Sequence, residues 1–299
     1  MIQLTSNNNI IVTSYYKIKN KRSSDDYNDW IVNFFYLNSL KVIYTNIDTL
    51  NSVFVKLFNN IKKLDNQNIK SYEYIFINKL DFTNIYIDDT TNSIFILQEL
   101  EDTFIWKNYK NLMIYSEKID PEITIGIIHN RYLYTIWNNK SFWLKETIDI
   151  ISAEGYYWVD IGCIRYNITD DVKTFVSSLN LVNRNNNKLI LSIIEEFIPS
   201  DEQYVNSIPY IYYNNNNVIR IQGGFFGGGK NEILEWCELY IEELNLFDNY
   251  KVFSGKDQYI MGSIYLKYKY KFDIFIPKYI KNDNKYCNDI WFRFLIHFG

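Results

Sequence analysis

An acidic residue directly follows one of the most apolar strand-like segments of the chain. Residues 156–160 read Tyr-Tyr-Trp-Val-Asp, so that Asp160 stands where a buried strand would end, and Arg165 follows shortly after it. A carboxylate held at the edge of a sheet can bind a divalent metal ion or a ribose hydroxyl. The alternative is a salt bridge in which Arg165 pairs with Asp160 and fixes a loop. Spacing alone leaves both interpretations open.

Two further strand-like segments, 9–14 and 41–45, also end in polar residues. The polar residues at these two ends are Thr13, Ser14, Tyr15 and Asn46. If the strands are parallel, their carboxyl ends meet at one edge of the sheet, where open α/β sheets bind ligands. The alternative is that polar residues simply terminate strands, which explains any one of them equally well.

A glycine-rich segment, Gly223-Gly224-Phe225-Phe226-Gly227-Gly228-Gly229-Lys230, holds five of the 11 glycines of the chain. We expect it to be a loop between a strand and a helix, where glycines allow close approach of a ligand and helix N-terminal amides bind an anion. Residues 224–230 also match G-x-x-x-x-G-K. Asn231 stands where a P-loop has the Ser or Thr that binds magnesium, and the segment comes late in the chain, so both features argue against a P-loop. A tight turn alone would need only one or two glycines.

The pattern of apolar residues predicts strands alternating with helices. The expected strands are 9–14, 41–45, 73–77, 112–115, 156–160, 188–194 and 218–222, and the expected helices are 121–150, 230–246 and a third that starts with Asp257 as its N-cap. This order predicts an α/β fold with a mainly parallel sheet between helices. Without a repeat or a long linker, we expect a single domain, 1–299.

Composition narrows the function classes. The net charge of −4 and the absence of a basic patch argue against a nucleic-acid partner. Three separated cysteines and only two histidines argue against a zinc cluster and favour a reducing compartment. The sequence shows no signal peptide and no apolar run long enough for a membrane span, so we expect a cytoplasmic protein.

Taken in order, these motifs resemble those of the bacterial HtrL/YibB (WlaTC-type) family of glycosyltransferases, which are similar to the GT-A fold. The residues that carry the resemblance are 12–16, 43–46, 137–140 with Phe142, 158–162 with Arg165, 223–228, and Asp257 with Gln258. The resemblance spans about residues 10–262 and implies transfer of a sugar from a nucleotide sugar, with a UDP-sugar as the expected donor, to a glycan or another hydroxyl acceptor. It implies a nucleotide-binding half at about 1–165 and an acceptor and catalytic half at about 166–299.

The resemblance also implies roles for particular residues. The donor would be bound by Thr13, Ser14, Tyr15, Asn46, Lys140, Asp160, Gly162 and Arg165. The sugar or acceptor would contact Gly223, Gly224, Phe225, Gly227, Gly228 and Gln258. A Mn²⁺ or Mg²⁺ ion would be bound by Asp160 and His297, although Gly162 replaces the second carboxylate of the usual Asp-x-Asp motif and leaves the metal requirement open.

If the reaction inverts the sugar, a carboxylate must deprotonate the acceptor, and Asp257 is the candidate base. On this hypothesis Asp257→Asn abolishes transfer and leaves the melting temperature nearly unchanged. The alternative is that Asp257 only caps a helix.

Two other functions are compatible with the sequence. One is a non-catalytic protein that binds a nucleotide sugar or carbohydrate on the same scaffold, and the other is a P-loop-like nucleotide hydrolase built on Lys230. Because the chain ends two residues after His297, it would also fit a fragment of a longer protein.

Overall fold

A computed structural model describes residues 9–18, 24–65, 72, 76, 84–127, 129–167, 169–178, 187–214, 217–276 and 294–295. The chain forms two compact units, each built from separate stretches. Unit 1 comprises Met1–Glu99, Trp143–Asn185 and Lys278–Gly299, and unit 2 comprises Leu100–Phe142 and Asn186–Pro277. Helix α5 (Arg131–Ile150) begins in unit 2 and ends in unit 1. The units therefore do not coincide with the predicted halves, 1–165 and 166–299.

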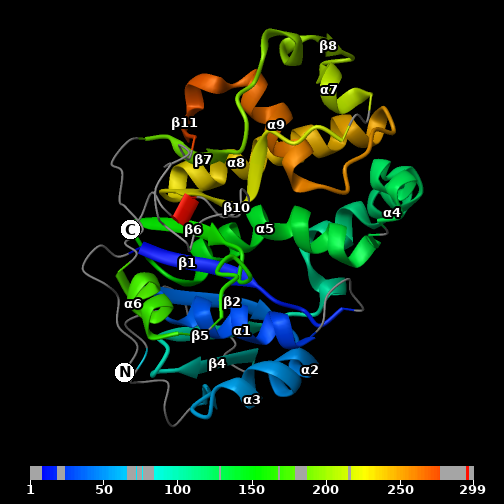
Figure 1. Ribbon diagram of the computed structural model, residues 1–299. Coiled ribbons are helices and arrows are strands. Elements are labelled where there is room, and N and C mark those ends of the chain that lie inside the picture. The colour runs from blue at the N-terminus through cyan, green and yellow to red at the C-terminus, as the bar shows by residue number, and fades with distance from the viewer. Residues whose placement is uncertain are drawn as a thin grey trace. The chain divides into compact units, whose positions relative to one another are not determined.

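Unit 1 contains four parallel strands followed by two antiparallel ones at one side. The strands are β1 (Asn9–Ser14), β2 (Leu40–Thr45), β3 (Lys62–Lys63), β4 (Ile85–Asp88), β5 (Ser93–Leu97) and β6 (Gly155–Val159). Their order is β6-β1-β2-β5-β4-β3, and β6, β1, β2 and β5 run parallel. Strands β4 and β3 are antiparallel to their neighbours. Figure 1 shows β6, β1, β2, β5 and β4 side by side in this order.

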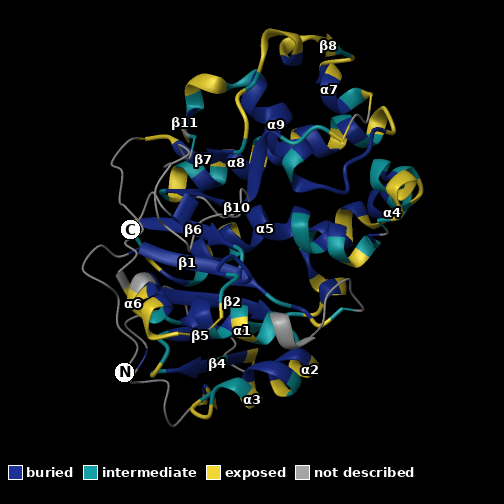
Figure 2. Ribbon diagram, in the orientation of Figure 1, coloured by how far each residue is buried: buried dark blue, intermediate teal, exposed yellow. Residues whose placement is uncertain are grey.

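Helical segments connect these strands. They are α1 (Ser24–Phe35), α2 (Ile47–Thr49), a π-helical turn (Leu50–Phe54), α3 (Val55–Leu57) and α6 (Asp170–Ser178). Strands β1, β2 and β6 are buried along their whole length, as the dark blue arrows in Figure 2 show. Burial of both faces explains why these strands read as continuous apolar runs and not as alternating patterns. The predicted parallel α/β arrangement of this part of the chain is confirmed.

A stack of aromatic rings forms part of the core of unit 1. The indole of Trp143 lies parallel to the rings of Tyr16, Tyr44 and Trp158, at centroid distances of 5.7–5.8 Å. Its Nε1 donates a 2.7 Å hydrogen bond to Oε1 of Gln98. The polar end of the buried indole is thus satisfied.

Unit 2 combines five strands, two of them only two residues long, with the longest helices. Its helical segments are a 3₁₀ turn (Leu100–Asp102), α4 (Phe104–Ile119), the 3₁₀ helix η5 (Pro121–Ile125), the first part of α5, a 3₁₀ turn (Pro199–Glu202), α7 (Tyr210–Tyr213), α8 (Lys230–Asn249), α9 (Asp257–Lys267) and a 3₁₀ turn (Lys269–Lys271). Its strands are β7 (Leu189–Ile193), β10 (Ile221–Gly228), β11 (Phe272–Phe275) and the short pair β8 (Tyr204–Val205) and β9 (Ile208–Pro209). Strand β7 pairs parallel with β11 and antiparallel with β10.

Two elements predicted between residues 112 and 150 differ from the structure. The strand expected at 112–115 is wrong, because these residues lie inside α4, whose buried residues recur at helical spacing and whose N-cap is Thr103. The helix expected at 121–150 is two helices. Gly126, with φ of 77°, ends η5, and the side chain of Asn130 accepts from the backbone N–H of Leu133 at the start of α5. The strand expected at 73–77 lies outside the described residues except for Phe76, which forms an isolated bridge with Ile151.

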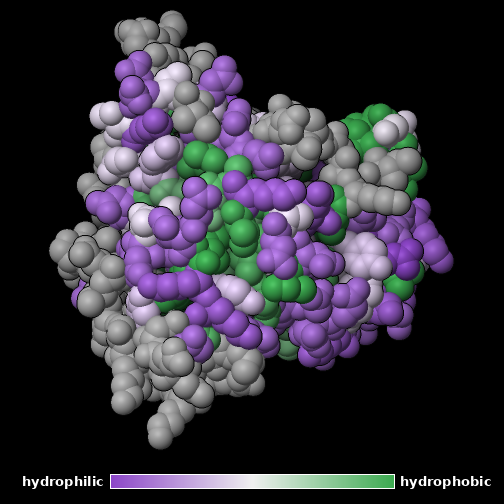
Figure 3. All heavy atoms as spheres, turned by 90° about the horizontal axis from the view of Figure 1, so that it is seen from below, coloured by the Kyte–Doolittle hydropathy of each residue, from purple (hydrophilic) through white to green (hydrophobic). Residues whose placement is uncertain are grey.

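Exposed aliphatic side chains occur at the side where α2 and α3 lie. Ile47 is 38% exposed and Val55 is 43% exposed. Figure 3 views this side and shows a strip of hydrophobic residues bordered by hydrophilic ones.

Of the helices in the described part of the chain, none has the length and apolar character required to cross a membrane.

Candidate functional site

The predicted donor-site residues of unit 1 lie at the carboxyl edge of its parallel strands. Strands β6, β1 and β2 end at Val159, Ser14 and Thr45 and are followed by Asp160, Tyr15 and Asn46. The last pairs of the register join Val12 to Trp158 and Ser14 to Tyr44. Since the three strands are parallel neighbours, the structure brings these polar ends together at one edge, as the sequence predicts.

The order of the strands reverses at β1. The chain passes from β1 to β2 and β5 on one side and returns to β6 on the other side. In open α/β sheets, ligands bind in the crevice outside the carboxyl ends of the strands at such a reversal. In unit 1 the topology therefore favours a ligand at the carboxyl ends of β1 and β6, between the two strands.

The last two residues of β1 carry buried hydroxyl groups. Thr13 is fully buried and Ser14 is 7% exposed. Within the described part of the chain, neither Oγ1 of Thr13 nor Oγ of Ser14 has a hydrogen-bond partner. Buried polar groups in native proteins are normally paired, and an unpaired one points to a missing partner such as a ligand or water.

Aromatic side chains and an arginine lie beside this edge. The ring of Tyr27, from α1, is 5.7 Å from that of Tyr15 and 5.1 Å from that of Trp30. The guanidinium of Arg165 lies over the ring of Trp30 at 4.8 Å, and its Nε donates a 3.1 Å hydrogen bond to the carbonyl oxygen of Gly162. Burial, followed by the nearby Tyr27, raises the pKa of Tyr15 to about 12, so its hydroxyl stays protonated at neutral pH.

Gly162 lies against the same aromatic side chains. A Cβ at this position would be 3.5 Å from Trp30 and 3.6 Å from Tyr27. Asp160 is half-buried, and its Oδ1 accepts a 2.7 Å hydrogen bond from Nε1 of Trp158. The indole thus helps to fix the direction of the carboxylate.

Asn46 has a local structural role. Its Oδ1 accepts a 2.9 Å hydrogen bond from the backbone N–H of Thr49 and caps α2, and its Nδ2 lies 3.3 Å from Oε2 of Glu99. Thr45 anchors the same edge, because its Oγ1 donates a 2.7 Å hydrogen bond to the carbonyl oxygen of Tyr15.

Lys140 and Asp257 form a buried ion pair in unit 2. Nζ of Lys140 lies 2.9 Å from Oδ2 of Asp257, and the two side chains are 5% and 3% exposed. Nζ also donates a 2.8 Å hydrogen bond to the carbonyl oxygen of Gly223. The backbone N–H of Gln258 donates to Oδ1 of Asp257. Both carboxylate oxygens are thus engaged, which gives Asp257 a structural role in holding α5, α9 and β10 together.

The helix predicted to start at Asp257 is confirmed, but the prediction that Asp257 is its N-cap is wrong. The N-cap of α9 is Lys256, and Asp257 is the first helical residue. Gln258 follows it and is half-buried. The neighbouring residues of α5 are also buried and polar: Nδ2 of Asn138 donates to the carbonyl oxygens of Ser254 and Gly255, and Oδ1 of Asn139 accepts from the N–H of Ile105. The motif Asn138-Asn139-Lys140 therefore ties α5 to three other segments of unit 2.

The glycine-rich segment is a strand and not a loop. β10 runs from Ile221 to Gly228 and is buried along its length, including Gly224, Phe225 and Gly227. Its pairing with β7 shifts between Ile221 and Phe226, which is the irregularity that glycines permit in a strand. A Cβ on Gly223 would lie 2.6 Å from Oδ2 of Asp257, so this position must be glycine for the ion pair to fit.

The structure of this segment also argues against the P-loop alternative. A P-loop wraps phosphates with the free backbone amides of a loop, whereas the segment 223–228 is part of a buried strand and only Gly229 remains as the N-cap of α8. Lys230 is the first residue of that helix. His297, the other predicted metal ligand, lies outside the described residues.

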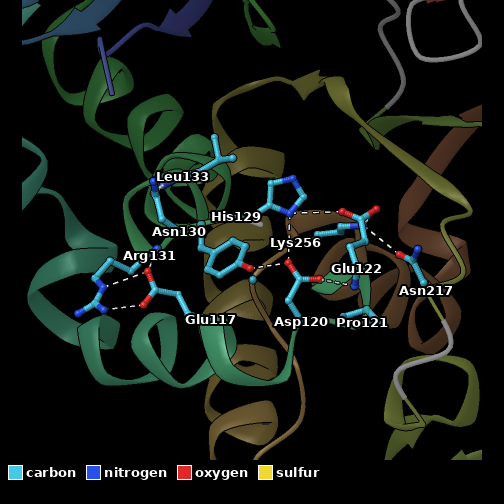
Figure 4. Close-up of polar contacts among 12 residues, drawn as sticks. Glu117, Asp120, Pro121, Glu122, His129, Asn130, Arg131, Leu133, Asn217 and Lys256 are labelled. Atoms are coloured by element: carbon cyan, nitrogen blue, oxygen red, sulfur yellow. Dashed lines mark hydrogen bonds and ion pairs between the residues drawn. The ribbon is translucent and has the colours of Figure 1, made fainter. Parts of the chain in front are cut away.

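The structure contains a polar cluster in unit 2 that the sequence did not predict. One ligand atom each of Asp120, Glu122 and His129 lies within 4.8 Å of the other two, so the three residues could hold a metal ion. Nδ1 of His129 is 3.1 Å from Oδ2 of Asp120 and 3.3 Å from Oε2 of Glu122. Figure 4 shows the three side chains turned toward one another, with Lys256 beside Glu122.

Hydrogen bonds keep Asp120 ionised within this cluster. Burial pushes its pKa upward, but hydrogen bonds from His129, Tyr134 and the backbone N–H of Glu122 outweigh burial and hold the pKa below its ordinary value. The hydroxyl of Tyr134 donates at 2.5 Å to Oδ2, and burial followed by this bond raises the pKa of Tyr134 well above its ordinary value. The carboxylate is therefore charged at neutral pH.

No protein-family model matches the chain, and a search of curated proteins finds no relative. The assignment of function therefore depends on the geometry of the two sites described above.

Proposed function

We propose that unit 1 binds the nucleotide part of a nucleotide sugar at the carboxyl ends of β1 and β6, and that the protein is a glycosyltransferase. The observation that carries this proposal is the reversal of strand order at β1, whose last two residues, Thr13 and Ser14, carry buried hydroxyls without partners among the described residues. Successive side chains of a strand point to opposite faces of the sheet, so a ribose or diphosphate oxygen in the crevice supplies a partner for the hydroxyl on its own face.

The surrounding side chains suit the same ligand. The half-buried rings of Tyr27 and Trp30 offer flat surfaces for a base, because aromatic stacking is tolerant of base identity. Arg165, always charged, offers hydrogen bonds to a diphosphate. Asp160 offers a carboxylate to a ribose hydroxyl or to a divalent ion that accompanies the diphosphate.

One observation favours a second candidate, a protein that binds a nucleotide sugar without transferring it. The predicted base, Asp257, is 3% exposed and paired with Lys140. A base must lie within hydrogen-bond reach of the hydroxyl that it deprotonates, and this carboxylate is engaged elsewhere. A retaining reaction needs no such base, so transfer is still our proposal.

A ligand screen tests the binding step. UDP-, GDP-, CMP- and dTDP-sugars are added to the full chain with and without Mn²⁺, and the melting temperature is measured. A ligand at a hundredfold excess over its Kd stabilises the chain by roughly 2–3 kcal/mol. We expect a UDP-sugar to do so; no shift with any of the ligands would exclude a nucleotide-sugar function.

Matched variants locate the binding. Thr13→Val removes a hydroxyl that has no protein partner, whereas Thr45→Val removes one that is bonded to the Tyr15 carbonyl at the same edge. We expect Thr13→Val to fold as stably as the wild type and to weaken nucleotide binding by roughly 2- to 13-fold, the equivalent of one hydrogen bond. An unchanged affinity in Thr13→Val would move the ligand away from β1.

A transfer assay separates the two candidates. The released nucleoside diphosphate is measured for the ligand that the screen identifies, with a panel of glycans and simple hydroxyl acceptors. Turnover that depends on an acceptor supports transfer. Saturable binding with no release of diphosphate in Mn²⁺ or Mg²⁺ would leave the binding protein as the function.

A further inference from the structure

The turn between α4 and α5 builds the Asp120–Glu122–His129 cluster. Asp120 ends α4 and caps η5, since its Oδ1 accepts a 2.8 Å hydrogen bond from the backbone N–H of Glu122. Gly126, with φ of 77°, then turns the chain. His129 is thereby brought back beside Asp120, with Oδ2 of that carboxylate directed at its Nδ1.

Two of the three separations between the ligand atoms are close to those of a tetrahedral metal site, and the third is no more than 4.8 Å. Zinc lies about 2.0–2.2 Å from nitrogen and oxygen ligands, so the ligand atoms of a tetrahedral site are separated by roughly 3.4 Å. The separations from Nδ1 of His129 are 3.1 Å to Asp120 and 3.3 Å to Glu122. A metal ion can therefore enter with small side-chain movements.

Neighbouring residues orient the two carboxylates. Tyr134 donates to Oδ2 of Asp120, and Nζ of Lys256 lies 2.8 Å from Oε1 of Glu122, the oxygen that does not face His129. Such outer contacts fix the direction of metal ligands. The ring of His129 is itself held edge-on to Trp137, at 5.0 Å between centroids. The three side chains are 1%, 15% and 4% exposed, so the ligand atoms are held in place before any ion binds.

A cavity adjoins the cluster. Its volume is about 660 Å³, and Asp120 and Asn217 are among its lining residues together with the apolar side chains of Ile123 and Ile125. Asn217 also accepts a 2.9 Å hydrogen bond from Lys256. Of the three proposed ligands, Asp120 is the one that lines this cavity. Three protein ligands are the number found in catalytic zinc sites, which keep one position for water or substrate.

We propose that Asp120, Glu122 and His129 bind a divalent transition-metal ion of the zinc class, with its remaining position open to a water molecule or to a substrate in the adjoining cavity. An imidazole with two carboxylates favours zinc, cobalt or manganese over calcium and magnesium. A bound ion of this class lowers the pKa of its water and polarises a carbonyl or phosphoryl oxygen. The site differs from the metal position predicted from the sequence, which used Asp160 and His297.

The alternative occupant of the same geometry is a proton. A protonated His129 would donate to the carboxylates of Asp120 and Glu122 and balance their charge together with Lys256. Metal binding and a protonated histidine exclude each other at Nδ1, because only a deprotonated nitrogen ligates a metal.

Cobalt titration tests the proposal on the full chain after treatment with a chelator. The visible absorption of Co²⁺ reports coordination by nitrogen and oxygen ligands, and Zn²⁺ is then added as a competitor. We expect one Co²⁺ per chain, displaced by Zn²⁺. Absence of saturable Co²⁺ binding, or binding that Zn²⁺ does not displace, would overturn the proposal.

The two histidines of the chain provide a matched pair of variants. We expect His129→Asn and Glu122→Gln to abolish Co²⁺ binding and His297→Asn to retain it, and Tyr134→Phe to weaken it roughly 10- to 100-fold. Glu122→Gln keeps the shape of the side chain, so the test does not depend on the folding of the His129 variant. Unchanged binding in both ligand variants, or an equal loss in His297→Asn, would overturn the proposal.

Nuclear magnetic resonance of the ring nitrogens needs no substitution at the cluster. With only two imidazoles in the chain, the His297→Asn variant assigns the remaining signals to His129. We expect Zn²⁺ to shift the Nδ1 signal of His129 as a metal ligand. A ring that stays doubly protonated in the presence of Zn²⁺ at neutral pH would support the proton and contradict the metal.

Discussion

Removing one partner of the buried Lys140–Asp257 pair should destabilise unit 2 strongly. The two groups are 2.9 Å apart and 5% and 3% exposed, so Asp257→Asn leaves the ammonium of Lys140 buried without the carboxylate that balances its charge. Breaking a buried pair by removing one partner costs about 3–5 kcal/mol. With an unfolding entropy of roughly 2.1 cal/mol/K per residue over 299 residues, this cost lowers the melting temperature by roughly 5–8 °C for a single transition.

Removing both partners of the pair should reduce the free energy of unfolding less than removing either one alone. Lys140→Met should cost as much as Asp257→Asn, because it leaves the carboxylate buried without its cation. The double variant Lys140→Met/Asp257→Asn should recover most of the loss, since buried ion pairs are often no more stabilising than neutral groups of similar volume. The exposed pair of Lys251 and Asp248, 61% and 43% exposed, is the matched control, and its disruption should cost less than about 1 kcal/mol.

Equilibrium unfolding in urea measures all four variants. Losses below about 1 kcal/mol in both single variants would refute the structural role of the pair. That result would instead favour the hypothesis from the sequence, in which Asp257 acts only as a base and its replacement leaves stability nearly unchanged.

Three further predictions concern other buried groups. Burial lowers the pKa of Lys41 to about 7, against the opposing effect of Asp88. The unfolded chain keeps this proton up to about pH 10.5, so the free energy of unfolding should rise between pH 7 and 10.5. In urea titrations at several pH values, Lys41→Met should reduce this slope by up to about 1.4 kcal/mol per pH unit. An unchanged slope would contradict the neutral buried lysine. Gly223→Ala places a Cβ 2.6 Å from an Asp257 oxygen and should lower the free energy of unfolding by roughly 1–3 kcal/mol. Gly228→Ala, whose nearest contact is 3.3 Å, should lower it less. Equal melting temperatures of the two variants would show that the ion pair moves freely. Thr45→Val should lower stability by about 1 kcal/mol, because it removes a buried hydrogen bond to a backbone carbonyl, and thermal unfolding without loss would contradict that bond.

The sequence predicts the parallel part of the fold well, because buried parallel strands are continuous apolar runs. The strand expected at 9–14 coincides with β1, and those at 41–45 and 156–160 differ from β2 and β6 by one residue at their ends. The polar strand ends of unit 1 meet at one edge for the same reason, since parallel neighbours must end on the same side. The strand predicted at 112–115 was wrong because a short apolar run does not distinguish a strand from the buried face of a helix, here α4.

The structure of the glycine-rich segment depends on tertiary packing, which local sequence patterns do not reveal. Five clustered glycines predict a flexible loop from local preference, but at Gly223 the absent side chain makes room for the carboxylate of Asp257, a residue distant in sequence. Composition alone did not reveal Tyr27 and Trp30 beside the strand edge, because aromatic residues are abundant throughout this chain.

The cluster of unit 2 was missed for a different reason. A search for cysteine and histidine spacings finds no metal motif in a chain with two histidines, yet Asp120, Glu122 and His129 lie within ten positions of one another in the sequence. The available signal was an acidic pair around Pro121, at the start of a helix, followed by a histidine after a glycine turn.

The central claim is that a nucleotide fills the position beside the hydroxyls of Thr13 and Ser14. Isothermal titration calorimetry of UDP and a UDP-sugar against the wild type and Thr13→Val measures it most directly. We expect saturable binding of one ligand per chain by the wild type and a dissociation constant several-fold higher in Thr13→Val, with equal melting temperatures of the two free proteins. Equal affinities in the two proteins, or no heat of binding in the wild type, would contradict it.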